Sequence, residues 1–412
     1  MSSRRQATLL LLPLIGGVVL RLIWVGDMEF KADEAYLFAH AQAGALPGLG
    51  QASGVGLRNP GLSVWIFVAL DHGFGLHTPT ALARGVMLVN VAALALLAVF
   101  ATRYVARPER ERWLWATALT AVNPTLIVFS RKLWAQSVLP FFTMLALLCW
   151  WQRGRARMSF AWGMSGALLG QIHMSGFFFA GALASWTALF DRRSARWPAW
   201  LAGSAVGVLP LIPWVHYVLT QHVPTRHALR NLVELTFWRL WLERTAGIDL
   251  YTSLGRHAPS FLAEPRVGGH ATYVVALLYA ISVGGGLLIL AGGGRALWPR
   301  RGDWRAMLAG RTSTALAVGA TLVGFGILLT ATAATIYRHY LIVAFALPFA
   351  WLAGLALLQP RRGRRALAAL CVCQAAISVA FLAHIHVHGG APGADYGVAY
   401  DRQPAVAGPR PH

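Results

Sequence analysis

The chain has 412 residues, of which 57% are hydrophobic and 12% are charged. A soluble protein of this composition lacks the polar surface to cover its core, so the composition excludes a soluble fold and indicates a polytopic membrane protein. The formal net charge of +21 would suit nucleic acid, but the arginines stand in short clusters between apolar segments of about 20 residues, the length that spans a bilayer. No nucleic-acid partner is therefore expected.

The first apolar segment covers residues 7–25 and follows Arg4 and Arg5. It has the outline of a signal peptide, but no small-residue cleavage site follows it and Arg21 interrupts the apolar run. We interpret it as an uncleaved span whose N-terminal side lies in the cytoplasm.

The basic clusters predict the topology, because Lys and Arg accumulate in cytoplasmic loops. All six clusters lie inside if the chain crosses the membrane eleven times. Segment 159–190 is interpreted as two short crossings, because one long helix there would place Arg192, Arg193 and Arg196 outside. The expected fold class is thus an all-α polytopic membrane protein with about eleven transmembrane helices. The crossings are expected at 7–25, 81–102, 113–130, 137–152, 159–172, 174–190, 197–217, 271–292, 313–335, 340–359 and 366–385.

Three outer segments are long. Segment 26–80 contains a second apolar run, 62–70, which is too short to span and predicts an interfacial or re-entrant helix. Segment 218–270 predicts a helix over about 225–245. Residues 1–390 are expected to form one transmembrane domain, and residues 391–412, rich in Pro, Gly and His, a disordered tail.

The stretch from Glu29 to His40 concentrates three carboxylates, a lysine, a tyrosine and a histidine. Asp33 can cap a helix whose first turn holds Glu34, because its side-chain oxygen can accept the open backbone N–H groups there. The structural alternative is an interfacial helix with a good cap and no chemical role.

Polar residues near the outer ends of the expected spans fall into one layer. Charged groups at this depth are costly unless they line a wet cavity or meet an ionic ligand. Arginine and lysine suit phosphate, and an aspartate can serve as a general base. Taken singly, the cations could instead be interfacial anchors and His173 a packing residue. The candidates are Asp33, Glu34, Arg84, Arg131, Lys132, Gln136, His173, Arg338, His339 and Tyr340.

Five short motifs, taken in order, resemble the GT-C superfamily of integral-membrane glycosyltransferases. The nearest branch is the one that holds protein O-mannosyltransferases and lipid A aminoarabinose transferases. The motifs are Lys31-Ala32-Asp33-Glu34-Ala35-Tyr36, Asn59-Pro60-Gly61, Ala83-Arg84, Asn123-Pro124 with Phe129-Ser130-Arg131, and Tyr337-Arg338-His339-Tyr340-Leu341.

The resemblance implies a GT-C-like glycosyltransferase domain over 1–390 that uses a polyprenyl-phosphate sugar donor. It implies that Asp33 is the catalytic base and Glu34 its structural or electrostatic neighbour. The donor phosphate would be bound by residues among Arg84, Arg131, Lys132 and Arg338, and Gln136, His173, His339 and Tyr340 complete the expected substrate-binding set.

The chain departs from the family's pattern at the start of the fourth span. Many relatives carry a second acid there, where this chain has Gln136-Ser137. Hard cations prefer carboxylate oxygens, so neither a divalent metal nor another cofactor is expected.

The expected function is transfer of a sugar, with inversion, to a lipid, glycan or protein acceptor on the outer side of the cell (inner) membrane. A transporter or flippase for lipid-linked sugars would explain the spans and the cationic layer equally well. Against it, the sequence shows no acid in mid-membrane, no ATP-binding motif and no inverted repeat.

Overall fold

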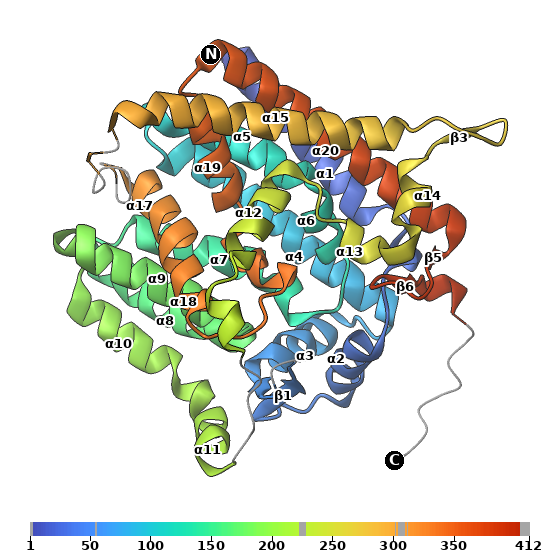
Figure 1. The fold of residues 1–412 in the computed structure, drawn as a ribbon. Coiled ribbons are helices and arrows are strands. Elements are labelled where there is room, and N and C mark those ends of the chain that lie inside the picture. The colour runs from blue at the N-terminus through green and yellow to red at the C-terminus, as the bar shows by residue number, and fades with distance from the viewer. Residues whose placement is uncertain are drawn as a thin grey trace.

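The computed structural model describes residues 3–53, 56–221, 228–300, 302–303, 310 and 312–403, and these are helical over most of their length (Figure 1). Three two-stranded antiparallel pairs accompany the helices: β1 (Leu49–Ala52) with β2 (Arg58–Pro60), β3 (Arg266–Val267) with β4 (His270–Ala271), and β5 (Gly390–Ala391) with β6 (Gly397–Val398). The α-helices are α1 (Ser3–Leu22), α2 (Ala32–Ala43), α3 (Leu62–Phe74), α4 (Pro79–Val99), α5 (Arg107–Val122), α6 (Pro124–Phe129), α7 (Ala135–Trp151), α8 (Ala156–Ile172), α9 (Ser175–Phe190), α10 (Trp197–Gly207), α11 (Ile212–Thr220), α12 (Thr236–Ala246), α13 (Tyr251–Leu254), α14 (Ala258–Leu262), α15 (Val274–Leu297), α17 (Ser313–Gly319), α18 (Gly326–Thr330), α19 (Leu347–Ala356) and α20 (Pro360–His388).

Each of the eleven expected crossings coincides with one helix or with consecutive helices. Within the described residues, five helices have the length and apolar composition to cross a membrane, or six if one bent pair counts as a single span. The prediction of a polytopic membrane protein is therefore confirmed, while the number of eleven transmembrane crossings stays a prediction. The five are Pro79–Tyr104, Trp197–Thr220, Val274–Leu297, Ser313–Thr330 and Pro360–His388, and the bent pair is Arg338–Ala344 with Leu347–Ala356.

Several expected spans are broken where the backbone cannot continue a helix. Asn123 leaves the helical conformation because Pro124 follows it, and its side-chain oxygen then caps α6 by accepting from the Leu126 N–H at 3.2 Å. The segment 159–190 divides at His173, which has extended backbone angles, into helices α8 and α9 that pack against each other. The expected pair of helices is present.

Helix α1 packs closely on α5. Gly17 makes this approach possible, because a Cβ at that position would lie 2.4 Å from the Ala121 carbonyl oxygen. Arg21, which interrupts the apolar run, is buried and donates to the Gly17 and Ala121 carbonyls at 2.8 and 2.6 Å. The arginine therefore satisfies the open C-terminal end of α5 and holds the two helices together.

The first outer segment folds into α2, the β1–β2 pair and α3, at the bottom of the view in Figure 1. Helix α2 begins at Ala32, so Asp33 lies within its first turn, and the expectation that Asp33 caps the helix is wrong. The carboxylate that performs this task belongs to Glu34, whose Oε2 accepts from the Lys31 N–H at 3.0 Å. The expected second helix, α3, has 13 residues and is too short to span.

The helix expected over about 225–245 begins later than predicted, at Thr236. From there, Phe237 and Trp241 form a buried apolar face, whereas Leu229 and Val233 before it are exposed. A segment without such a face has no tertiary packing to hold it helical. Residues 222–227 lie outside the described residues.

The segment after residue 390 differs from the disordered tail that was expected. Glycines at positive φ, among them Gly393 (φ 76°) and Gly397 (φ 74°), form the tight β5–β6 hairpin. The hairpin packs back on the body through buried Tyr396 and Ala399, and the Tyr400 N–H donates to the Met28 carbonyl at 3.0 Å. Proline and glycine here mark turns rather than disorder. Residues 404–412 of the expected tail lie outside the described residues.

Candidate active site

A cavity of about 210 Å³ lies under the first outer segment. Its walls come from α2, the β1–β2 pair, the start of α7, the break between α8 and α9, and the turn that precedes α19. Five residues that the sequence placed in one layer line it together: Asp33, Gln136, His173, His339 and Tyr340.

Asp33 is the one carboxylate among the described residues that line this cavity. It projects from the first turn of α2, and its Oδ1 accepts a hydrogen bond from Gln51 Nε2 at 2.5 Å. Gln51 is held in turn by Asn59, whose Nδ2 donates to the Gln51 carbonyl at 3.1 Å. The β1–β2 pair therefore fixes the orientation of the Asp33 carboxylate and leaves Oδ2 available to accept a proton.

Two buried polar atoms on residues of the cavity wall have no hydrogen-bond partner among the described residues. They are Asn59 Oδ1 and Trp134 Nε1, an acceptor and a donor. Buried polar groups are nearly always paired in folded proteins, so a pair of unsatisfied atoms at one cavity is typical of a site that a ligand completes.

One wall of the cavity is aromatic. The His339 ring lies 4.8 Å from Tyr340, 5.4 Å from Trp134 and 5.8 Å from His173, measured between ring centroids. Tyr337 stacks on His339 with an interplanar angle of 4°. Aromatic faces with a few converging polar groups are typical of small-molecule sites.

His173 is held in one orientation between α8 and α9. Its Nδ1 accepts from the Ser175 backbone N–H at 3.3 Å and lies 2.7 Å from the Ser175 hydroxyl. Burial lowers the pKa of His173 to about 4. The ring is consequently neutral at pH 7, and this bonding assigns its proton to Nε2.

A cluster of charged residues adjoins the cavity wall at Trp134 and His339 and consists of Glu29, Lys31, Lys132, Arg338 and Asp395. Glu29 forms ion pairs with both lysines, and Asp395 lies 2.7 Å from Arg338 and 3.8 Å from Lys31. Burial works to raise the pKa of Asp395, but the three cations together outweigh it and lower the pKa. Three cations face two carboxylates, so the charged cluster carries a net positive charge.

Glu34 is fully buried against this charged cluster and does not line the cavity. Burial, reinforced by repulsion from Glu29, raises the pKa of Glu34 to about 7, although Lys132 partly opposes the shift. Glu34 thus contacts the Lys31 backbone and the charged cluster, and its role beside Asp33 stays a prediction.

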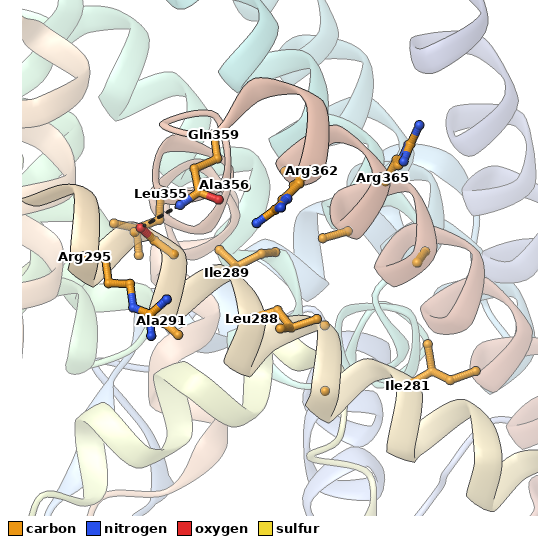
Figure 2. Close-up of a pocket in the computed structure, with 17 residues that line it drawn as sticks. Ile281, Leu288, Ile289, Ala291, Arg295, Leu355, Ala356, Gln359, Arg362 and Arg365 are labelled. Carbon is orange, nitrogen blue, oxygen red and sulfur yellow. Dashed lines mark hydrogen bonds between the residues drawn. The ribbon is translucent and has the colours of Figure 1, made fainter.

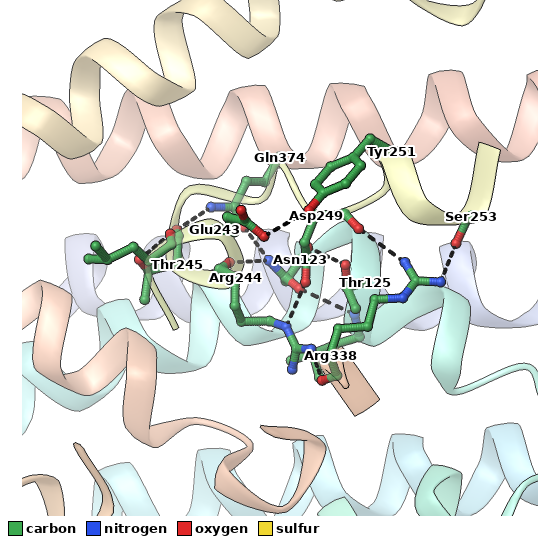
Figure 3. Close-up of polar contacts among 12 residues, drawn as sticks. Asn123, Thr125, Glu243, Arg244, Thr245, Asp249, Tyr251, Ser253, Arg338 and Gln374 are labelled. Carbon is green, nitrogen blue, oxygen red and sulfur yellow. Dashed lines mark hydrogen bonds and ion pairs between the residues drawn. The ribbon is translucent and has the colours of Figure 1, made fainter. Parts of the chain in front are cut away.

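Arg338 is positioned by a buried polar network that Figure 3 shows. Its guanidinium donates to the Asp249 carbonyl at 3.0 Å and to the Ser253 hydroxyl at 2.8 Å. Arg244 donates to the Arg338 carbonyl at 2.8 Å and to the Asp249 carboxylate at 3.0 Å. With this many fixed partners, Arg338 is preorganised beside the aromatic wall.

Two of the expected cations lie elsewhere. Arg131 is buried and donates to the carbonyls that end α1, including Ile23 at 2.6 Å, so it satisfies a helix terminus. Arg84 is exposed on α4 and does not line the cavity.

Four residues that shape this site were not among the residues predicted from the sequence: Gln51, Asn59, Glu29 and Asp395. Gln51 and Asn59 are neutral and gave no charge signal. Asn59 carried a different signal, because it belongs to the Asn59-Pro60-Gly61 motif. Glu29 belonged to the charged stretch but was not selected, and Asp395 lay in the segment expected to be disordered.

One group of side chains among the described residues could hold a metal ion, and it lies outside this cavity. Glu264, His384 and His388 place ligand atoms within 4.8 Å of one another at the end of α20. None of the three lines the cavity that holds Asp33.

These observations define the class: a multi-pass helical membrane protein with a polar cavity enclosed by its first outer segment. Its fold is similar to that of the crystal structure of ArnT from Cupriavidus metallidurans bound to undecaprenyl phosphate, with a TM-score of 0.51, 14% identity, and coverage of 94% of this chain and 78% of that one. The same protein in the apo state matches with a TM-score of 0.45, 12% identity, and coverage of 94% and 80%. No protein-family model and no curated protein sequence matches the chain. This similarity confirms the expected fold, that of a polytopic helical membrane protein like ArnT.

Proposed function

We propose that the protein is an inverting glycosyltransferase that moves a sugar from a polyprenyl-phosphate donor to an acceptor on the outer side of the membrane. The observation that carries the proposal is the single cavity carboxylate, Asp33, oriented by Gln51 in a fold similar to ArnT. The ArnT structure contains undecaprenyl phosphate, which supports a lipid phosphate as the donor's carrier.

In the proposed reaction Asp33 acts as the general base. Its free Oδ2 accepts the proton of the acceptor's hydroxyl or amine while that oxygen or nitrogen attacks the anomeric carbon of the sugar. The bond from the anomeric carbon to the phosphate oxygen breaks, and the polyprenyl phosphate leaves with the bonding electrons. One displacement inverts the anomeric configuration.

The leaving phosphate gains negative charge, and the charged cluster is suited to stabilise it. The Lys132 ammonium lies 4.4 Å from the ring centroid of Trp134, which is itself a wall residue, and Arg338 directly precedes His339. Preorganised cations in a site of low dielectric stabilise developing charge strongly, because they need no reorganisation during the reaction. Arg84 and Arg131 have no part in this proposal.

Gln136, His173, His339 and Tyr340 are proposed to bind the sugar. They offer hydrogen-bonding groups and flat apolar faces within the same cavity. The reaction as written needs no divalent metal, since Lys132 and Arg338 supply the positive charge.

Transport of a lipid-linked sugar is the competing function, and one reconstitution separates the two. The purified protein in liposomes is given a panel of polyprenyl-phosphate hexoses and pentoses, with a membrane lipid extract as the acceptor source. Release of free polyprenyl phosphate together with a glycosylated product supports the transferase. A donor that changes leaflet with its sugar still attached, and no released polyprenyl phosphate, would overturn it.

A further inference from the structure

A groove of about 630 Å³ lies between α15, α19 and α20 (Figure 2). It shares no lining residue with the cavity that holds Asp33. Its polar end is formed by the C-terminal part of α15 and the first turns of α20, whereas Asp395 of the charged cluster follows the far end of that 29-residue helix. At 1.5 Å per residue the two ends of α20 are about 43 Å apart, so the groove is a separate site.

The floor of the groove is apolar and shallow because small residues form it. An added Cβ at Gly284 would meet no atom within 4 Å, which marks open space beside the backbone. Ile281 and Leu288 stand along its side and are 41% and 72% exposed. The groove therefore presents a continuous apolar surface to the hydrocarbon of the bilayer.

The polar end of the groove is cationic. Figure 2 shows Arg362 reaching from α20 toward α15, where Arg295 stands, with Gln359 donating to the Gly292 carbonyl at 3.3 Å nearby. Among the described residues, no carboxylate lines the groove and neither arginine forms an ion pair. Arg364, by contrast, lies on the same helix and is paired with Glu111 at 2.6 Å.

The length of the groove matches one leaflet. Ile281 and Arg295 are fourteen residues apart on α15, a rise of about 21 Å, and half of the ~30 Å hydrocarbon core is about 15 Å. The part of the groove that extends beyond the hydrocarbon core reaches the headgroup region, where the two arginines lie. Basic pockets between transmembrane helices on the cytoplasmic side are typical sites for anionic lipid headgroups.

We propose that this groove binds an anionic glycerophospholipid, with its phosphate between Arg295 and Arg362 and an acyl chain along the floor at Gly284. The occupant follows from charge complementarity, because two unpaired guanidinium groups above an apolar floor favour a phosphate attached to a hydrocarbon chain. The proposal is independent of the glycosyltransferase proposal.

Native mass spectrometry of the full chain in detergent tests it with phosphatidylglycerol and phosphatidylcholine of identical acyl chains. We expect tighter binding of phosphatidylglycerol, a loss of about fivefold for Arg362→Gln, and about 25-fold for Arg295→Gln with Arg362→Gln, since each basic residue near the surface contributes about fivefold. Arg361→Gln is the matched control. It removes the same charge from the adjacent residue, which does not line the groove.

Gly284→Leu tests the apolar floor without touching the arginines. It should fill the groove and displace both lipids, whereas Gly294→Leu, equally unobstructed but outside the groove, should not. Thermal unfolding of every variant confirms that it is folded.

Three outcomes would overturn the proposal: equal binding of the two lipids, an equal loss for Arg361→Gln, or displacement of phosphatidylglycerol by inorganic phosphate alone. Competition by a polyprenyl phosphate at equal concentration would also overturn it, because the groove would then be a donor site. Asp33→Asn should leave phosphatidylglycerol binding intact, so the two proposals fail separately.

Discussion

Replacing Asp33 by asparagine separates its chemistry from its structural contacts. Asparagine has nearly the same shape and keeps an oxygen that can accept from Gln51, now 2.5 Å away. The change removes a charge from the first turn of α2, which costs about 0.3–1 kcal/mol, and turns a charge-assisted hydrogen bond into a neutral one for about 1 kcal/mol more. The free energy of unfolding should therefore fall by about 1–2 kcal/mol.

The catalytic effect of the same change should be larger. General-base catalysis contributes about 10²–10⁴-fold, which at 1.36 kcal/mol per decade is about 3–5 kcal/mol of activation free energy. We expect turnover in an in vitro transfer assay with a polyprenyl-phosphate sugar to fall by that factor. Donor binding, measured separately, should stay nearly unchanged, because the proposed phosphate contacts come from other residues.

Asp71→Asn is the matched control for this experiment. Asp71 lies in the same outer segment and also accepts from a glutamine, Gln42, at 2.6 Å, but it does not line the cavity. It should lose stability and keep its turnover. An Asp33→Asn enzyme that works at the wild-type rate, or an Asp71→Asn enzyme that loses as much turnover, would refute the assignment of Asp33 as the base.

Arg338→Ala should weaken donor binding by about tenfold or more and affect turnover at saturation less, because it removes the proposed charge-assisted phosphate contact; unchanged donor affinity would exclude that contact. Glu34→Gln should stabilise the protein above pH 7, since a carboxyl whose pKa is raised to about 7 in the fold is penalised once it ionises. The gain, on the order of 3 kcal/mol, should shrink as the pH falls through 7 and vanish near pH 4, and thermal unfolding across pH shows whether it does. Transfer activity should survive EDTA, and a complete loss that Mn²⁺ or Mg²⁺ restores would show a metal in the reaction. A reporter active only in the cytoplasm, fused after Gln403, should stay silent; a strong signal from it would contradict the predicted orientation.

The sequence predicted the cavity residues better than the cations. Gln136, His173, His339 and Tyr340 were found because helix ends bring polar residues to one depth, and that rule needs no knowledge of packing. Arg131 was assigned to phosphate because a sequence does not show which backbone carbonyls need a donor. In the fold, Arg131 donates hydrogen bonds to the carbonyls at the end of α1.

Two other expectations failed for local reasons. Proline and glycine are equally common in disordered segments and in tight hairpins, and only the burial of Tyr396 distinguishes the two for residues 391–403. The helix at 225–245 began late because its apolar face starts at Phe237. The spacing of apolar residues there was visible in the sequence, but the length of helix that tertiary contacts support was not.

The position of Asp395 sets the order in which the site can be assembled. The residue is synthesised 364 positions after Lys31, its partner across the charged cluster. At about 5–20 residues per second, roughly 20–70 seconds separate the two during translation. Throughout that interval the nascent chain holds Lys31 and Lys132 with Glu29 and Glu34 as their acidic neighbours, and Arg338 is added before Asp395 is synthesised. The pairing of Arg338 with its carboxylate is therefore among the last steps of biogenesis, and a chain cut before the hairpin would retain its membrane helices around a cluster that lacks one of its two carboxylates.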